Sequence, residues 1–388
     1  MRTQVAIVGA GPAGLTLALL LERAGIEAVV LEDRSCEHVE SRARAGLLEQ
    51  NTVDLLHELG VGSRLAREGL EHNGIKLRCQ GRTIYIAIAE LTGRHVTIYG
   101  QHEVLKDEIA AVLDRGVPLY FEVSEVAVHD LDSERPRVTF ADASGARKDL
   151  ECDFIAGCDG FHGVCRPSVP PERLRAHELV YPFSWLGILA QAPPSTDELI
   201  YAWHERGFAL HSMRSPTVSR LYLQVPNETS LDDWPDERIW DELRARIGEV
   251  NAGPIFDKGV TPMRSYVCEP LQHGRLFLAG DAVHIVPPTG AKGLNLAVND
   301  VRLLAAGLAS FYNDGSTSLM QTYSTAALRR VWRAQDFSNY MTQLLHDLGD
   351  GEFGRRLQLA RLEYLERSEA ARTSLAENYA GLPAAPDF

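Results

Sequence analysis

The chain has 388 residues, of which 45% are hydrophobic and 24% charged, and its formal net charge is −14. These values predict a soluble globular protein of two or three domains whose core needs no disulfide or metal ion to stabilise it. The negative charge argues against a nucleic-acid partner, because that class of protein needs Lys and Arg to neutralise phosphates.

The apolar stretch at residues 5–21 has the length of a secretory signal. Glycines and a proline interrupt it and no small-residue cleavage site follows, so we expect neither a signal peptide nor a membrane span. The six cysteines are scattered and form no CxxC pair, which favours free thiols over a disulfide or metal framework. We therefore expect a cytoplasmic protein without a metal site and without a membrane partner.

The first elements predict a βαβ unit. Residues 3–8 are a short apolar run that suits a buried parallel strand, and residues 12–24 have helical periodicity and end before a glycine. Residues 27–31 are a second apolar strand, which ends at Glu32. A unit of this kind begins many nucleotide-binding domains.

The turn between the first strand and the helix has the sequence GAGPAG. Gly9 permits the tight turn, Gly11 allows a pyrophosphate to approach the backbone, and Gly14 allows close packing of the helix on the strand. The helix N-terminus supplies partial positive charge for an anion, and Glu32 is placed to accept hydrogen bonds from an adenosine ribose. These features favour dinucleotide binding, and the alternative is a glycine turn of structural use only.

Two later apolar strands end in a turn with an acidic residue. Residues 155–160 are IAGCDG, and residues 276–282 are LFLAGDA, followed by a glycine-rich segment at 286–295 that opens a helix. A carboxylate at a strand end, such as Asp159 or Asp281, can hold a ribityl hydroxyl. The amides at the N-terminus of the helix can face a flavin pyrimidine edge, where negative charge accumulates on reduction. Either aspartate taken alone is more often a turn residue.

The order of these motifs, GxGxxG, then Cys-Asp-Gly, then Gly-Asp-Ala, resembles the FAD-binding fingerprints of the single-component flavin aromatic hydroxylases. The resemblance implies that Asp281 holds the ribityl chain of FAD, and that Arg44 and Gln101 contact its pyrophosphate and ribityl regions. It also implies that Asn295 and the backbone after Pro288 border the isoalloxazine. Further cofactor contacts are expected at Arg42, Asp159, Arg220 and Leu294.

The resemblance also implies the architecture, and the residue patterns agree with it. From about residue 181 to 267, alternating stretches predict antiparallel strands, and the chain beyond residue 294 is mostly helical in pattern. We expect an α/β fold (α+β overall) in three parts. These are a Rossmann-like βαβ FAD-binding domain (1–175), an inserted antiparallel β-sheet substrate domain (176–285), and a flavin-edge loop with a helical C-terminal interface region (286–388).

Further segments resemble the 4-hydroxybenzoate 3-monooxygenase branch of this family. They are residues 44–50, 158–163, 212–214, 219–222 and 377–383, together with Tyr201. The substrate-binding residues that the resemblance implies are Ser212, Arg214, Tyr222, Tyr201 and Pro288. The catalytic residues that it implies are Tyr201, Tyr379, His72 and Pro288.

The chemistry of these side chains agrees with the roles that the resemblance implies. The guanidinium group of Arg214 can donate two parallel hydrogen bonds to a carboxylate, and the hydroxyls of Ser212 and Tyr222 can hydrogen-bond the remaining lone pairs. Two phenols in series can pass a proton, and a histidine such as His72 can exchange it with water near neutral pH. Read singly, a strand tyrosine is more often a packing residue and a lone histidine a structural one.

The function implied is hydroxylation of 4-hydroxybenzoate, a small aromatic acid, at its 3-position to give 3,4-dihydroxybenzoate. NADH or NADPH would reduce the FAD, O2 would form a flavin C4a-hydroperoxide, and the enzyme would be a homodimer as in the family. The strongest alternative is a sister hydroxylase for another phenolic acid. A non-catalytic flavin-binding protein would not need the Ser212, Arg214 and Tyr222 cluster, and a plain NAD-dependent dehydrogenase would not use the two later motifs.

The electron donor is predicted from the residues that follow Glu32. NADPH-using relatives tend to place Arg directly after this acid and Tyr a few residues on, where this chain has Asp33 and His38. A carboxylate near a 2′-phosphate is repulsive, so we expect NADH to be preferred, with Arg34 and Arg42 partly offsetting the effect. The alternative is that Asp33 only caps a surface helix.

Overall fold

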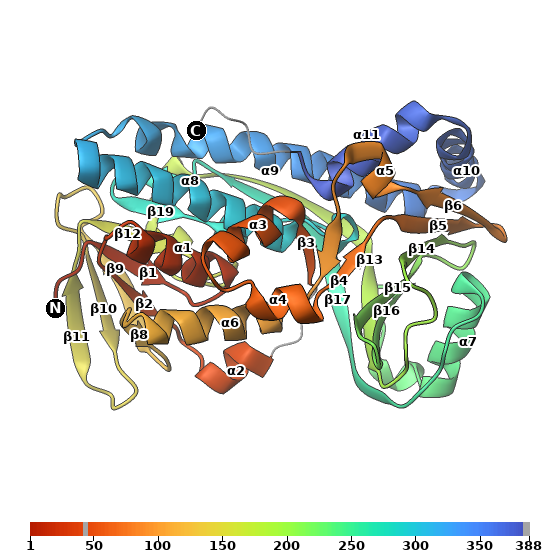
Figure 1. The fold of residues 1–388 in the computed structure, drawn as a ribbon, viewed down its shortest axis with the longest axis horizontal. Coiled ribbons are helices and arrows are strands. Elements are labelled where there is room, and N and C mark those ends of the chain that lie inside the picture. Colours follow the sequence, from red (N-terminus) through yellow and green to blue (C-terminus); the bar gives the residue numbers. More distant parts are fainter. Residues whose placement is uncertain (42–45, 383–388) are drawn as a thin grey trace.

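The computed structural model describes residues 1–41 and 46–382, so Arg42 and Arg44 lie outside the described residues. One half of the molecule contains a sheet of mainly parallel strands, which come from both early and late parts of the chain (Figure 1). In spatial order its strands are β18 (Gln272–His273), β19 (Leu276–Leu278), β12 (Phe154–Gly157), β1 (Val5–Val8), β2 (Ala28–Leu31) and β8 (Leu119–Tyr120). β1 lies between β12 and β2 and pairs in parallel with both.

Helix α1 (Pro12–Arg23) connects β1 to β2, which confirms the predicted βαβ unit. Its buried leucines and alanines pack against α6 (Gln101–Asp114) and α8 (Gly293–Asp314). A separate antiparallel sheet of β9 (Ser124–His129), β10 (Arg137–Ala141) and β11 (Arg147–Glu151) lies at the end of this region that holds the N-terminus (Figure 1). The predicted α/β fold with a helical C-terminal region is therefore confirmed.

The largest sheet lies in the other half of the molecule (Figure 1). In spatial order its strands are β20 (His284–Ile285), β17 (Ile255–Glu269), β13 (Arg175–Ala190), β16 (Val218–Val225), β15 (Ala209–Ser215), β14 (Leu199–Trp203), β5 (Ile75–Cys79) and β6 (Arg82–Ile86). Helix α7 (Asp236–Ile247) covers one face through a buried cluster that includes Trp240 and Leu243. The predicted antiparallel strands are confirmed here, but β5 and β6 come from the range assigned to the FAD-binding domain. The exact division into three ranges stays a prediction.

Smaller elements join the two halves. The strands β3 (Leu47–Glu49), β7 (Val96–Ile98) and β4 (Leu70–His72) form a short sheet between them. The remaining short helices are α2 (Cys36–Ser41), α3 (Gln50–Glu58), α4 (Ser63–Glu68), α5 (Ile88–Thr92), η1 (Arg166–Ser168), η2 (Pro171–Arg173), η3 (Leu231–Asp233), η4 (Gly280–Ala282) and η5 (Pro288–Gly290).

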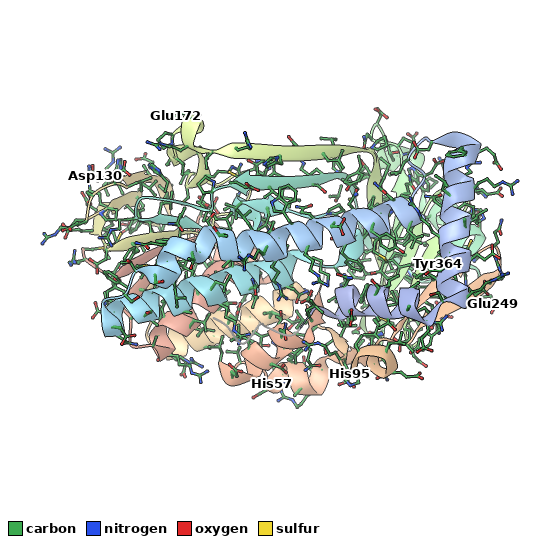
Figure 2. The ribbon with its side chains drawn as sticks, turned by 90° about the horizontal axis from the view of Figure 1, so that it is seen from above. His57, His95, Asp130, Glu172, Glu249 and Tyr364 are labelled. Carbon is green, nitrogen blue, oxygen red and sulfur yellow. The ribbon has the colours of Figure 1, made fainter. Side chains whose placement is uncertain are left out.

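The C-terminal helices tie the halves together. The long helix α9 (Ser318–Leu345) runs beside α8 and reaches the large sheet, where it contacts β14 and β17 (Figure 2). Helices α10 (Gly351–Arg367) and α11 (Glu369–Ala380) follow, and α11 packs on α5 and β6. Within residues 1–41 and 46–382, no helix combines the length and apolar character needed to cross a membrane.

Candidate active site

The glycine turn before α1 has the geometry that a dinucleotide pyrophosphate requires. Gly9 has a positive φ of 105°, and a Cβ there would collide with the Cys158 backbone. A Cβ on Gly14 would collide with the Gly9 carbonyl, so the helix packs directly on the turn. A Cβ on Gly11, in contrast, would meet no protein atom, and no side chain caps the N-terminus of α1. The first-turn amides of α1 thus remain available to an anion.

Glu32 lies directly after β2, where the sequence analysis expected an acid for the adenosine ribose. Its carboxylate is buried and accepts hydrogen bonds from the amides of Ala10 at 2.7 Å and Arg34 at 3.0 Å. Burial, and then the neighbouring Asp33, raise the pKa of Glu32 to about 7, although these two amides oppose the shift. The carboxylate is therefore held rigidly beside the glycine turn.

We expect Gly11→Val to fold normally and to retain much less FAD. Gly11 has an ordinary extended conformation, but a side chain there would occupy the space in front of the α1 amides. Flavin released per polypeptide from purified protein measures the effect. Gly259→Val is the matched control, since a Cβ on Gly259 also meets no neighbour. Equal flavin content in the two variants would contradict the assignment.

Asp159 and Asp281 each follow a strand of the parallel sheet, as predicted, and the structure shows that these two strands, β12 and β19, are neighbours. Asp159 Oδ2 accepts a hydrogen bond from the Cys165 amide at 2.8 Å, whereas its Oδ1 is buried and has no partner among the described residues. Burial raises the pKa of Asp159. Asp281 is exposed on η4. Its contact with the ribityl chain stays a prediction.

The segment predicted to border the isoalloxazine opens α8. Pro288 is exposed in η5, and Leu294 is half-buried in the first turn of α8, which has no side-chain cap. Asn295 is buried, and its side chain is fully used within the protein. Its Oδ1 accepts hydrogen bonds from the Glu49 amide and the Thr52 hydroxyl, and its Nδ2 donates to two backbone carbonyls. Asn295 thus anchors the start of α8 to β3 and α3.

The residues predicted to bind the substrate carboxylate lie on one face of the large sheet. Ser212 and Arg214 are two residues apart on β15, so both point to the same side. Ser212 is directly opposite Arg220 on β16, and Arg220 and Tyr222 are again two residues apart. Arg214 Nη1 donates a hydrogen bond to Ser212 Oγ at 3.3 Å. The sheet register therefore gathers an arginine fork and two hydroxyls.

The charges on this face act on one another. Burial acts to raise the pKa of Tyr222, but the two guanidinium groups of Arg220 and Arg214 outweigh it and lower the pKa. Burial lowers the pKa of Arg214, and Tyr222 opposes that shift. Arg220 lies over the Tyr222 ring at 5.1 Å, and its Nη1 is 3.7 Å from Asp257. This positively charged face attracts an anionic group.

The predicted tyrosine pair lies next to this face. Tyr201 on β14 is opposite Leu210 on β15, and Leu210 is opposite Tyr222 on β16. One row across three strands therefore holds the phenols of Tyr201 and Tyr222. The hydroxyls of Tyr201 and Tyr379 are 2.8 Å apart, and both side chains are fully buried. Burial raises the pKa of each, so both are neutral phenols that can pass a proton at neutral pH.

His72 is the third residue of the predicted relay. It was expected to exchange protons with water, but its side chain is buried. Its side chain is 1% exposed, so Nδ1 contacts Glu198 Oε2 at 2.6 Å in place of water. Its Nε2 is buried without a hydrogen-bond partner among the described residues. Among the described residues His72 and Tyr379 share no hydrogen bond, so the connection between them stays a prediction.

A buried ionic cluster next to Tyr379 was not predicted from the sequence. Lys292 Nζ lies 2.6 Å from Glu49 Oε1 and also donates to the Tyr379 carbonyl at 2.9 Å. Arg330 Nη2 contacts the second oxygen of Glu49 at 2.8 Å. Both Lys292 and Glu49 lie inside matched motifs, but their pairing joins residues 243 positions apart. The cluster connects the start of α8 to Tyr379, the second residue of the predicted relay.

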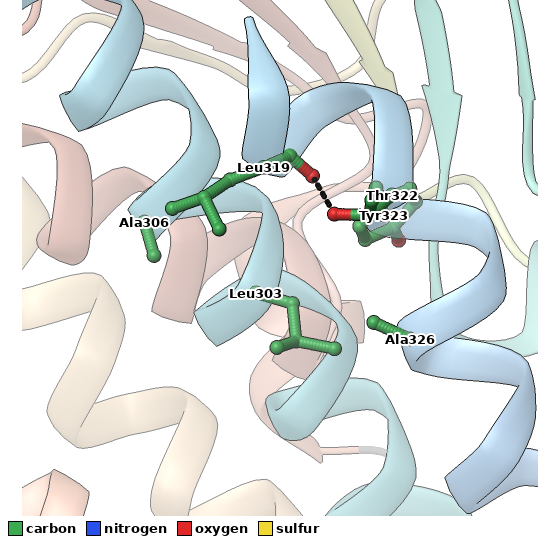
Figure 3. Close-up of a pocket in the computed structure, with 6 residues that line it drawn as sticks. All are labelled: Leu303, Ala306, Leu319, Thr322, Tyr323 and Ala326. Carbon is green, nitrogen blue, oxygen red and sulfur yellow. Dashed lines mark hydrogen bonds between the residues drawn. The ribbon is translucent and has the colours of Figure 1, made fainter. Parts of the chain in front are cut away.

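A small hollow between α8 and α9 offers no comparable chemistry (Figure 3). Its lining residues are Leu303, Ala306, Leu319, Thr322, Tyr323 and Ala326. The two hydroxyls there already donate to the backbone: Thr322 to Leu319 at 3.2 Å, and Tyr323 to Leu278 at 2.8 Å. The hollow is a packing feature between helices.

Three comparisons with known proteins agree with the geometry. A family model described as FAD binding domain matches residues 2–338. The p-hydroxybenzoate hydroxylase of Acinetobacter baylyi (strain ATCC 33305 / BD413 / ADP1) is 50% identical, over 99% of this chain and 96% of that protein. The 3-amino-4-hydroxybenzoate 2-monooxygenase PtnB3 of Streptomyces platensis is 27% identical over 85% of each chain. The crystal structure of p-nitrophenol 4-monooxygenase PnpA from Pseudomonas putida DLL-E4 shares the fold, with a TM-score of 0.84 at 17% identity, over 99% of this chain and 100% of that chain.

Proposed function

Because the chain belongs to the FAD-binding family of flavoprotein aromatic hydroxylases, we propose that its substrate is 4-hydroxybenzoate and its product 3,4-dihydroxybenzoate. The observation that carries this proposal is the row of Tyr201, Leu210 and Tyr222 across three strands. An anion-binding face lies at one end of it and the Tyr201–Tyr379 hydrogen bond at the other. A ring with its carboxylate and hydroxyl in para positions matches this arrangement.

The residues divide the work between holding the substrate and activating it. Arg214, with Ser212 and Tyr222, binds the carboxylate and fixes the ring. Tyr201 accepts the phenolic proton while its own proton passes to Tyr379, which leaves a more nucleophilic phenolate. Bound FAD supplies the reduction of O2 and the electrophilic oxygen, while the buried surroundings exclude water.

The choice of substrate is tested by turnover of a panel of hydroxybenzoates with FAD-loaded protein. We expect the para isomer to give the highest kcat/KM, because the anion-binding face and the tyrosine pair lie apart on the sheet. A higher value for the 2- or 3-hydroxy isomer would favour a sister hydroxylase instead.

We further propose that NADH is the preferred electron donor, on the evidence of Asp33. The Asp33 carboxylate is exposed and lies 3.5 Å from the Arg34 guanidinium, so part of its charge is compensated. The start of α2 is hydrogen-bonded by Ser35, whose hydroxyl accepts from the His38 amide at 3.2 Å. Among the described residues, no amide at the start of α2 donates to the Asp33 carboxylate, so its charge remains available to repel a 2′-phosphate.

One carboxylate about 4–5 Å from a 2′-phosphate is expected to disfavour NADPH by roughly 1–2 kcal/mol, which is about tenfold. We therefore expect Asp33→Arg to shift the ratio of kcat/KM values toward NADPH by about tenfold or more. Glu134→Arg, at an exposed acid in the loop between β9 and β10, is the matched control for added charge. A clear NADPH preference of the unmodified protein would contradict this proposal. A homodimer and a cytoplasmic location complete the proposal, and both rest on the family.

A further inference from the structure

The proton relay has a buried end without a described outlet. The hydroxyls of Tyr201 and Tyr379 lie 2.8 Å apart, close enough to pass a proton, but the side chain of His72, the next predicted member, is 1% exposed. A proton that reaches the imidazole must leave through a group that contacts both the ring and water. Such a group is the carboxylate of Glu198.

Glu198 immediately precedes β14, the strand that carries Tyr201. Its Oε2 lies 2.6 Å from His72 Nδ1, and its side chain is 14% exposed. Its Oε1 accepts hydrogen bonds from the Asn73 amide at 3.2 Å and the Tyr85 hydroxyl at 3.3 Å. The carboxylate is thus held from three sides while it retains access to solvent.

We propose that Glu198 is the outlet of the relay and the residue that positions His72. An ionised carboxylate only accepts hydrogen bonds, so His72 Nδ1 carries a proton and Nε2 presents its lone pair to the buried side. This matches the buried, unpartnered Nε2. Glu198 acts through His72 and does not touch the substrate, so it is a positioning residue.

The proposed transfer moves one proton from the substrate to the solvent. The phenolic proton enters at Tyr201, and one proton moves on at each step, through Tyr379 and a bridging water to His72 Nε2. His72 then gives its Nδ1 proton to Glu198, which releases it to water. The substrate loses one proton, the solvent gains one, and the reverse transfer on product release resets the imidazole.

Other titratable groups surround His72 on separate elements. Tyr85 on β6 contacts the Glu198 carboxylate, and the pKa of Tyr85 is raised first by burial and then by this charge. His95 lies 3.5 Å from the exposed Glu71, next to His72 on β4. Burial and Tyr201 raise the pKa of Tyr379, and the charge of Glu198 acts in the same direction. Within the described residues, Glu198 is the one group among these that hydrogen-bonds to the His72 side chain.

The inference rests on the proposed function, and proton release tests the two separately. FAD-loaded protein is mixed with 4-hydroxybenzoate in weak buffer containing a pH indicator, and proton release and phenolate absorbance are followed across the pH range. We expect Glu198→Gln to slow release about tenfold or more without changing the Kd of the substrate. His72→Asn should have the same effect, and the double variant should be no slower than either single one.

Glu198→Asp, which keeps the charge on a shorter side chain, should recover part of the rate. Glu71→Gln removes a nearby exposed carboxylate and should leave release unchanged. Release at the wild-type rate in Glu198→Gln at every pH, with His72→Asn slow, would overturn the inference and leave the proposed function standing. Absence of proton release from the unmodified protein would contradict the proposed function, and this inference with it.

Discussion

Arg214→Lys is expected to keep FAD and to raise the Kd and KM for 4-hydroxybenzoate about 10- to 150-fold. Lys retains the positive charge but loses the two-pronged geometry that matches a carboxylate. Removing a hydrogen bond to a charged group costs roughly 1.5–3 kcal/mol, which corresponds to that range. The 3.3 Å hydrogen bond from Arg214 to Ser212 would also be lost, so the serine hydroxyl would no longer be held toward the ligand.

Titration of the oxidised, FAD-loaded protein with the substrate measures this change directly. Arg244→Lys is the matched control, because this half-exposed arginine lies on α7, which covers the other face of the sheet. We expect the control to bind as the unmodified protein does. An unchanged Kd in Arg214→Lys would show that the carboxylate binds elsewhere.

Tyr201→Phe is expected to bind 4-hydroxybenzoate but to hydroxylate it poorly. The substitution removes the hydroxyl that lies 2.8 Å from Tyr379 and so breaks the relay at its first step. Without a phenolate the ring is a weaker nucleophile, and we expect the product formed per nicotinamide consumed to fall about tenfold or more. The electrons from the nicotinamide then reduce O2 to H2O2, which is released.

The readout for Tyr201→Phe is the ratio of hydroxylated product to nicotinamide oxidised, with H2O2 measured in the same sample. Tyr364→Phe removes the hydroxyl of an exposed tyrosine on α10, and as a comparison it should alter coupling far less. A wild-type ratio in Tyr201→Phe would remove Tyr201 from the relay.

Local patterns predicted the nucleotide-binding half of the fold well. The apolar runs at 5–8 and 28–31 form fully buried strands, and a glycine turn and a helix lie between them. Here the hydrophobic pattern and the turn residues both indicated the structure that forms. The period-two alternation of β15 and β16 also predicted strands, and it placed Ser212 beside Arg214 on one face.

Non-local pairing explains what the sequence did not reveal. Strand β5 adds to β14 in parallel, with Ile75 opposite Leu199, and no local signal marks a partner so far along the chain. Glu198 is one acid in a loop, and only the fold brings it to His72. Glu49 and Lys292 likewise belong to different motifs, and they meet only because α8 packs on β3. Each of these contacts depends on tertiary structure and not on spacing.

The central claim is tested most directly by identifying the product of FAD-loaded protein incubated with 4-hydroxybenzoate, O2 and each nicotinamide in turn. Chromatography with mass detection separates the dihydroxybenzoate isomers. We predict 3,4-dihydroxybenzoate carrying one oxygen atom from 18O2, with nicotinamide consumed in equal amount. Nicotinamide oxidation that yields only H2O2, or a product hydroxylated at another position, would contradict the account.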